Sequence, residues 1–324
     1  MSCAQVKQNM NLQDIEETEV KNFQTLLNYL QRLAADGVTP LIEKQVKFML
    51  DNSAKFFTHL VMEECFPTIH RLTINNRIFG ENKRANEIKY LKYPPKEFVK
   101  KYGRCNQPNE SILYAAFSIP TVLNELKPRV GDLVTETIWR VKENRTLKFC
   151  PIFRNQPEDN EILNPTTFKI NQEFERLIHN YPPNLKKQIV QLTQFIADTF
   201  SKRITSNNHL DYIFSAYFAS KILNEFEYGT IEAIYYPSVQ DKLSFENIAI
   251  KPQSFDDKYE LVEVRESVVF SDPSSGYGGY VMKSLSDCKS FDYTSGKILW
   301  QKDKFSQPKE ILKMLIKDYK LNLE

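Results

Sequence analysis

Cysteine is scarce in this chain, and its pattern is not that of a disulfide-stapled or zinc-binding domain. The five cysteines are Cys3, Cys65, Cys105, Cys150 and Cys288, an odd number spread over the whole chain. No CxxC pair and no cluster with zinc-ligand spacing occurs among them. We therefore expect reduced thiols in a cytoplasmic protein, without a metal centre.

Net charge and long apolar runs are also missing. The 43 lysines and arginines nearly balance the 41 acidic residues, which leaves a formal charge of +2. No overall attraction to nucleic acid or to an anionic membrane follows, so no direct nucleic-acid contact is expected. The N-terminus lacks the order of a signal peptide, and no apolar run approaches the roughly 20 residues that span a bilayer. The sequence thus predicts a soluble protein without a membrane partner.

Several catalytic motifs are absent as well. The four histidines, His59, His70, His179 and His209, form no HExxH or HxxxH pair, which disfavours a metallohydrolase. No GxSxG elbow surrounds Ser238, which disfavours an ordinary serine hydrolase. The chain also lacks a GK[ST] loop and a GxGxxG turn between a strand and a helix.

The N-terminal part of the chain carries the pattern of two helices. Its 324 residues allow one large domain or two smaller ones. Apolar residues at helical spacing cover residues 17–36 and stop at Gly37, a good helix terminator. Thr39 and Pro40 then favour the start of a second helix through Phe57. Residues 1–65 are therefore predicted to form a helical hairpin whose role is packing.

The following segment alternates between apolar and polar residues, as a half-buried strand does. This strand covers Ile69 to Ile74, and the alternation places Arg71 on the face of Ile69. An inward arginine needs an anionic partner, because burying its charge alone is costly. Arg77 is the alternative if Arg71 does not fill this role.

Residues 102–126 combine a polar turn, an apolar strand and a short helix. Gly103 allows a sharp turn that brings Arg104 toward a cleft, and residues 112–117 predict a strand that contains Tyr114. Ser118 is a good N-cap for a helix that reaches residue 126. Glu125 lies near the end of that helix, where a carboxylate opposes the helix dipole, which suggests a role other than stability. Residues 133–141 alternate again and are expected to pair beside the strand of residues 112–117.

The remaining segments complete a core and add an extension. Residues 144–164 are polar and are predicted to leave the core, and two helices over 168–179 and 185–203 follow them. We therefore interpret about 144–205 as an insertion. The predicted core covers residues 66–252. Its last elements are a helix over 211–223 and strands over 231–236 and 247–250. Ser238 lies just past a strand end, where it can face a cleft. Residues 253–324 form a strand-rich extension that ends in a helix.

Five side chains stand at strand ends or on presumed inward faces, and their chemistry is complementary. Arg71, Arg104, Tyr114, Glu125 and Ser238 supply two guanidinium groups, an aromatic ring, a carboxylate and a hydroxyl. This set suits a phosphate-bearing ligand whose reaction centre develops positive charge. We expect Arg71, Tyr114, Glu125 and Ser238 to converge on one cleft.

The same residues carry a family resemblance. The run Gly103-Arg104-Cys105-Asn106, then Leu113-Tyr114-Ala115, then Thr121 with Glu125, and far downstream Tyr236-Pro237-Ser238, resembles the RES-domain family. That family is named for its arginine, glutamate and serine, and Ile69-His70-Arg71 approximates its first arginine. The resemblance covers about residues 66–142 and 207–252, and His70 stands where an aromatic residue is common.

The resemblance implies both a fold and an activity. The fold would be α+β, with a core of mostly antiparallel sheets and helices similar to ADP-ribosyltransferases, plus the N-terminal hairpin and the helical insertion. The activity would be NAD degradation without a metal, by a toxin paired with a Xre-type antitoxin protein; a homo-oligomer is also compatible with it. Arg71 and Arg104 would grip the pyrophosphate and Tyr114 would stack near nicotinamide. Glu125 would stabilise the ribose cation and Ser238 would orient Glu125 or the ribose.

Three functions stay open at this point. An NAD glycohydrolase or phosphorylase would cleave the nicotinamide–ribose bond and use water or phosphate as the nucleophile. An ADP-ribosyltransferase would use the same residues but modify a macromolecular target. A non-catalytic module would bind a nucleotide without turnover.

Overall fold

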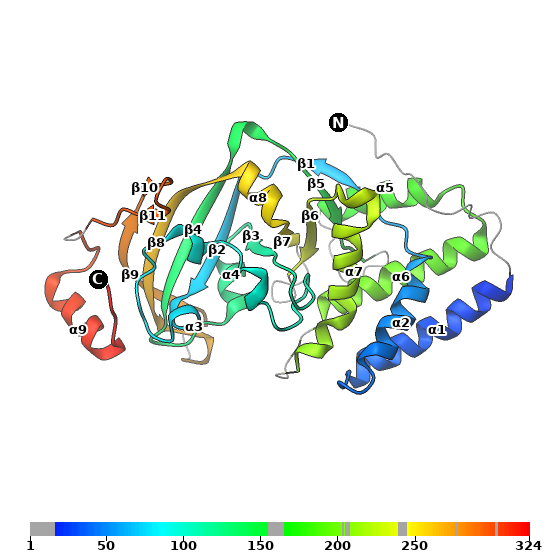
Figure 1. Ribbon diagram of the computed structural model, residues 1–324, viewed down its shortest axis with the longest axis horizontal. Coiled ribbons are helices and arrows are strands. Elements are labelled where there is room, and N and C mark those ends of the chain that lie inside the picture. The colour runs from blue at the N-terminus through cyan, green and yellow to red at the C-terminus, as the bar shows by residue number, and fades with distance from the viewer. Residues whose placement is uncertain are drawn as a thin grey trace. The chain divides into compact units, whose positions relative to one another are not determined.

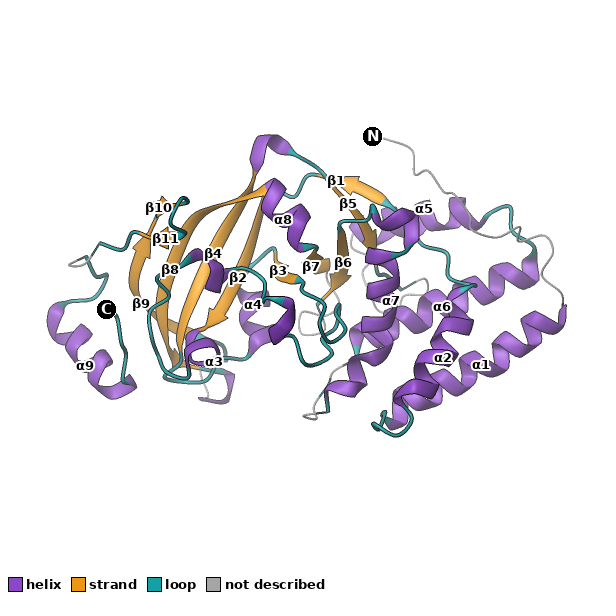
Figure 2. Ribbon diagram, in the orientation of Figure 1, coloured by secondary structure: helices purple, strands orange, loops and turns teal. Residues whose placement is uncertain are grey.

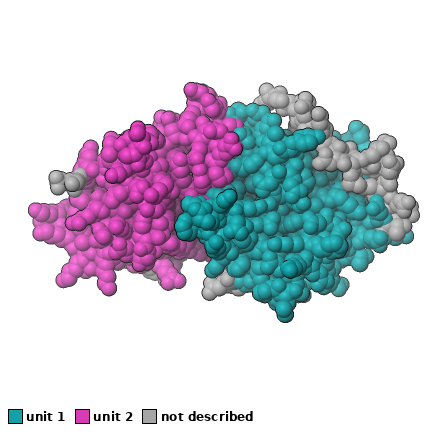
Figure 3. Space-filling model, viewed as in Figure 1, with its two compact units in different colours: residues 1–64, 95–112, 146–251 teal, residues 65–94, 113–145, 252–324 magenta. Residues whose placement is uncertain are grey.

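The computed structural model describes residues 17–154, 165–202, 204, 208–238, 245–275, 278–301 and 304–324. They fall into two compact units, teal and magenta in Figure 3. The first unit comprises residues 1–64, 95–112 and 146–251, and the second comprises 65–94, 113–145 and 252–324. The predicted core of residues 66–252 contributes to both, so the boundaries read from the sequence stay a prediction.

The first unit combines a group of helices with four strands (Figures 1 and 2). Its helices are α1 (Glu17–Asp36), α2 (Glu43–Ala54), α5 (Pro165–Ile178), α6 (Pro183–Ser201) and α7 (Ile213–Asn224). Its strands are β1 (Met62–Glu64), β5 (Leu147–Pro151), β6 (Ala233–Pro237) and β7 (Phe245–Ile250), in the order β1-β5-β6-β7. Strands β5 and β6 run parallel, while β1 with β5 and β6 with β7 run antiparallel.

Apolar stripes hold the helices of this unit together. Helix α1 packs against α2 and α6, and α7 packs against α2 and α6. Leu30 of α1, Leu50 of α2, Leu192 of α6 and Phe218 of α7 are fully buried. Each such side chain contributes roughly 1.5–3 kcal/mol by leaving water. This confirms the N-terminal helical hairpin, and Gly37 ends α1 with a φ of +93° that side chains rarely adopt.

The second unit is built on a five-stranded antiparallel sheet. Its strands are β2 (Thr68–Ile74), β3 (Leu113–Ala116), β4 (Leu133–Val141), β8 (Tyr259–Ser271) and β9 (Val281–Cys288), in the order β3-β2-β4-β8-β9. A small hairpin of β10 (Phe291–Asp292) and β11 (Lys297–Ile298) is separate. The helices are α3 (Asn75–Phe79), α4 (Ile119–Leu126), α8 (Pro252–Lys258) and α9 (Lys309–Tyr319).

Each face of this sheet has its own apolar cluster. On one face, Leu72 and Ile74 of β2 pack with Val122 and Leu123 of α4. On the other, Leu133 and Val268 pack with leucines of α9 and of the C-terminal tail. The second unit therefore buries both faces of its sheet, and with the first unit it gives the α+β class that the sequence predicts.

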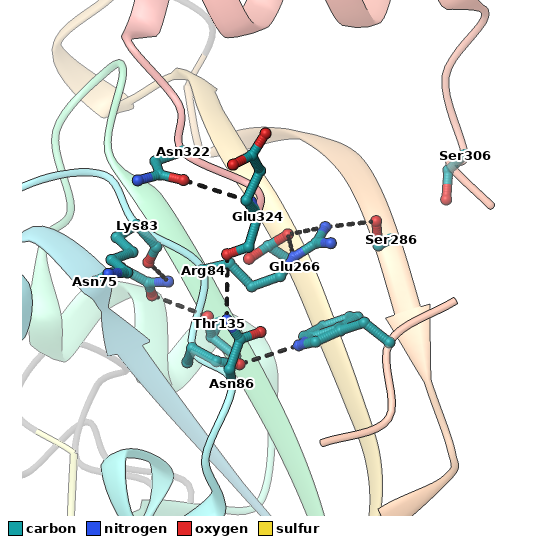
Figure 4. A network of polar contacts seen from close by, with 12 residues as sticks. Asn75, Lys83, Arg84, Asn86, Thr135, Glu266, Ser286, Ser306, Asn322 and Glu324 are labelled. Carbon is teal, nitrogen blue, oxygen red and sulfur yellow. Dashed lines mark hydrogen bonds and ion pairs between the residues drawn. The ribbon is translucent and has the colours of Figure 1, made fainter. Parts of the chain in front are cut away.

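A buried ion pair lies within the second unit (Figure 4). Arg84 donates from Nε and Nη2 to Glu266 Oε2 at 3.0 and 2.7 Å, and from Nη2 to Ser286 Oγ at 3.0 Å. The Arg84 guanidinium also lies 4.6 Å from the ring centre of Trp300. Burial raises the pKa of Glu266, and Arg84 opposes that rise by charge and hydrogen bonding.

Three details of the fold differ from the sequence predictions. Helix α2 begins at Glu43, because Thr39 accepts a backbone bond from Ile42 in a turn instead of capping the helix, and it ends at Ala54. Strand β4 pairs with β2 and β8, so β2 separates it from β3. Residues 147–151 form β5, which the polar surroundings of that segment concealed. Its partners β1 and β6 are distant in sequence, so local pattern could not reveal it.

Candidate functional site

Arg71 stands in the middle of β2, as the alternation predicts. Its strand neighbour on β4 is Thr137, and it leaves the sheet on the face opposite Leu72 and α4. Nη1 donates to the Tyr114 carbonyl oxygen at 2.9 Å, while Nε is buried without a hydrogen-bond partner among the described residues. Burial lowers the pKa of Arg71 to about 10, and the nearby Tyr114 opposes this. An anion at Nε would supply the missing acceptor.

Helix α4 carries Glu125 and has the predicted start. Ser118 caps it: its Oγ accepts from Thr121 N at 3.4 Å, and Pro120 stands in the first turn. The helix ends at Leu126, followed by Lys127 in the left-handed conformation. Glu125 is half-buried in the last turn, where the helix dipole gives it no stabilisation.

Tyr114 lies in the short strand β3 and is half-buried. The register of β3 against β2 is given by the pair His70–Ala116. Because the Tyr114 carbonyl accepts from Arg71, two of the predicted site residues are in direct contact within the second unit.

Arg104 is held by helix α6 in the first unit. Its Nη1 donates to the Phe200 carbonyl, and Nη1 and Nη2 both lie 3.4 Å from the Lys202 carbonyl. The guanidinium therefore neutralises the negative end of α6, as a cation at a helix C-terminus does. The turn before it closes through Gly103 N, which donates to Asn106 O at 3.0 Å. Tyr102 anchors that turn by donating from its hydroxyl to Glu43 Oε1 at 2.6 Å.

Ser238 directly follows β6 in the first unit, as predicted. Its side chain is fully buried, since none of its surface is exposed. Residues 239–244 after it lie outside the described part of the chain.

Arg77, the alternative to Arg71, has a different environment. It is exposed, and its Nη2 donates to the Leu126 carbonyl oxygen at the end of α4 at 3.0 Å. A cavity of about 270 Å³ lies beside it, lined by Ile74, Asn76, Arg129 and Asp132. Arg71 is the better match to the buried arginine that the sequence predicts.

The predicted residues are divided between the two units. Arg71, Tyr114 and Glu125 belong to the second unit, where Arg71 contacts Tyr114. Arg104 and Ser238 belong to the first. The convergence of all five on one cleft stays a prediction.

One pair of titratable residues was missed by the sequence predictions. Glu136 of β4 is 8% exposed, and its Oε1 lies 3.5 Å from Nδ1 of His70 on β2. The alternation of β4 carried the signal, because it places Glu136 on the same face as its neighbours Val134 and Ile138. A charge between two apolar positions of one strand face is unusual and indicates a specific partner.

Metal-binding clusters and membrane-spanning helices are both absent from the described ranges. No three His, Cys, Asp or Glu residues there gather around a point that could hold a metal ion. No helix within those ranges combines the length and the apolar character needed to cross a membrane.

Comparison with known proteins adds no family. Neither a model of a known protein family nor a curated protein matches the chain. The chemistry of the site therefore rests on the residues themselves: a half-buried arginine whose buried Nε has no acceptor among the described residues, a tyrosine beside it, and a carboxylate on the helix that follows.

Proposed function

We propose that this protein degrades NAD by cleaving the bond between nicotinamide and ribose, as a glycohydrolase or phosphorylase similar to RES toxins. The observation that carries the proposal is Arg71. Its guanidinium is held by the Tyr114 carbonyl, and its buried Nε has no acceptor among the described residues. Burial lowers the pKa of Arg71 to about 10. No carboxylate lies within ion-pair distance of it among the described residues, so a ligand anion is the natural partner.

The reaction suits the remaining groups. As nicotinamide leaves, positive charge develops on the ribose, and the Glu125 carboxylate stabilises it. Arg71 binds the pyrophosphate, and Arg104 does so with donors not used by the α6 carbonyls. Tyr114 stacks near nicotinamide, and Ser238 orients Glu125 or the ribose. Removing one such transition-state contact typically costs about a hundredfold or more in rate.

Tyr114 is the predicted site residue that directly contacts Arg71. Arg71 leaves β2 on one face of the sheet, whereas α4 with Glu125 packs on the other, and the Tyr114 backbone contacts Arg71.

Product analysis tests the proposal. Purified protein is incubated with NAD in phosphate-free and in phosphate buffer, and the products are separated by chromatography. We expect free nicotinamide, together with ADP-ribose or its 1″-phosphate. NAD left intact, under conditions where calorimetry shows that it binds, would establish the non-catalytic alternative instead.

The transferase alternative has one feature in its favour. The N-terminal hairpin and the C-terminal extension are not explained by the resemblance and could present a macromolecular target. With labelled NAD, this alternative predicts a labelled protein or nucleic-acid band while free ADP-ribose stays low.

The cellular role that we propose is that of a cytoplasmic toxin, restrained by a Xre-type antitoxin protein. Depletion of NAD would then arrest growth when the protein is expressed alone. Expression of the wild-type protein should lower cellular NAD, whereas expression of the variant Glu125→Gln should not. Equal NAD levels in the two cultures would contradict this role.

A further inference from the structure

A row of charged side chains crosses the sheet face on which α4 packs. The strand register aligns Leu72 of β2 with Glu136 of β4, Arg265 of β8 and Asp287 of β9. Paired residues of neighbouring strands point to the same face, so these three charges share the face of Leu72. His70, two residues before Leu72, lies on this face as well.

Glu136 is the buried member of the row, and its Oε1 makes ion pairs but no hydrogen bond within the described residues. Its side chain is 8% exposed, and Oε1 makes no hydrogen bond to the described residues. His70 Nδ1 lies 3.5 Å away and Arg265 Nη1 lies 3.7 Å away. Arg265 already donates from Nε to Glu263 Oε1 at 2.7 Å. His70 is therefore the nearer partner for the open carboxylate oxygen.

This geometry favours a proton on Nδ1 of His70. Nδ1 is buried and lies 3.5 Å from Glu136 Oε1 without a hydrogen bond, so a proton on Nδ1 is the one that the carboxylate attracts. The lone pair then lies on Nε2, which forms no hydrogen bond with the described residues. The side chain keeps 19% of its surface exposed, so a small molecule can reach it.

We propose that His70 and Glu136 activate the nucleophile of NAD cleavage and that this nucleophile is water. His70 is the catalytic base and Glu136 is the positioning residue that fixes its tautomer. This inference rests on the proposed function. The position of His70 is consistent with that function. His70 pairs with Ala116 of β3, two residues beyond Tyr114, and it lies on the sheet face against which the helix of Glu125 packs.

The proton and electron balance is complete without a further reactant. The oxygen of water forms a bond to C1′ of the ribose, and its proton moves to Nε2 of His70. The bond between C1′ and the nicotinamide nitrogen breaks, and its electron pair neutralises the charge of the pyridinium ring. His70 then releases the proton to solvent, so the products are ADP-ribose, nicotinamide and a proton.

The charges around His70 favour water over phosphate. The strand register places four carboxylates and two cations on the sheet face of His70: Glu136, Glu260, Glu263, Asp287, Arg140 and Arg265. Lys289 lies 3.5 Å from Glu263, and α4, which packs on this face, carries Glu125. Phosphate is already anionic, so it gains nothing from a base and is repelled by the excess of carboxylates. Water is neutral and needs the base.

The tautomer is tested first, because it does not depend on NAD turnover. Histidine is labelled with 15N, and long-range 1H–15N correlation spectra are recorded for the wild type and for Glu136→Gln under the same conditions. We expect the Nδ1–H tautomer for His70 in the wild type and a loss of this preference in the variant. An Nε2–H tautomer in the wild type would overturn the pair.

Kinetics test the role in catalysis. His70→Gln should lower kcat roughly a hundredfold with little change in KM, because a positioned base supplies about this factor. His179→Gln is the matched control, since His179 is exposed on another segment, and it should behave as the wild type does.

The outcomes separate this inference from the proposed function. Nicotinamide release that is unchanged in rate and pH profile by His70→Gln would overturn the inference alone. Formation of ADP-ribose 1″-phosphate as the main product in phosphate buffer would do the same. Absence of nicotinamide release from the wild type at every pH would overturn the proposed function as well.

Discussion

The buried ion pair of the second unit gives the sharpest stability prediction. In Arg84→Met the apolar stem remains, but the Glu266 carboxylate loses two charge-assisted hydrogen bonds in a place where it has no exposed surface. Removing one partner of a buried ion pair costs about 3–5 kcal/mol, and we expect a loss in this range. The double variant Arg84→Met/Glu266→Leu removes the orphaned charge and should recover most of the loss.

Tryptophan fluorescence is the assay, because it reports on this unit alone. The chain has two tryptophans, Trp139 and Trp300, and both belong to the second unit. Urea unfolding followed at their emission gives the free energy of unfolding of that unit. A loss below about 1 kcal/mol for Arg84→Met would refute the reasoning, as would a double variant no more stable than the single one.

The pH dependence of this variant has a definite sign. Burial raises the pKa of Glu266 in the folded protein, and Arg84 opposes the rise, so Arg84→Met raises it further. A carboxyl with a raised folded pKa favours the folded state below its unfolded pKa, and this advantage is lost as the pH rises through the folded pKa. The difference in stability between wild type and variant should therefore be small at acidic pH and grow toward neutral pH.

Three further changes test other parts of the structure. Gly131→Ala places a Cβ 2.9 Å from Tyr319 Cδ1 at a φ of +89°, and it should destabilise the second unit by about 1–3 kcal/mol in the same fluorescence assay. Ser118→Ala removes the cap of α4 and should cost about 1 kcal/mol, whereas Ser118→Asp should cost little; equal losses would contradict the capping role. Arg104→Lys weakens the contacts with the α6 carbonyls and should cost about 1–2 kcal/mol, followed by far-UV circular dichroism. If Arg104 also binds the pyrophosphate, the KM for NAD should rise in Arg104→Lys. An unchanged KM would mean that Arg104 stabilises the end of α6 and does not bind NAD.

Local signals in the sequence were sufficient to predict a helix boundary where a single residue determines it. Gly37 ends α1, and Ser118 with Pro120 starts α4 at the predicted place, because caps and terminators act within one turn. The alternation that located β2 also gave the correct face for Arg71. Strand β4 was placed at its observed bounds for the same reason.

Strand pairing was the part that local pattern could not supply. Strand β5 forms because β1 and β6 flank it, and β4 lies beside β2 rather than β3, since these choices depend on contacts between distant segments. The His70–Glu136 pair was missed for this reason, as only the register of β2 with β4 brings the two together. The fixation of Arg104 by α6 also involves residues almost a hundred positions away.

The central claim is that Glu125 drives cleavage of NAD, and one comparison of rates tests it most directly. Nicotinamide release is measured for the wild type, for Glu125→Gln and for Glu81→Gln, an exposed carboxylate of the same unit that serves as the matched control. The account predicts release by the wild type and by Glu81→Gln, and a rate lower by about a hundredfold or more for Glu125→Gln. Equal rates for all three proteins, or no release from any of them, would contradict it.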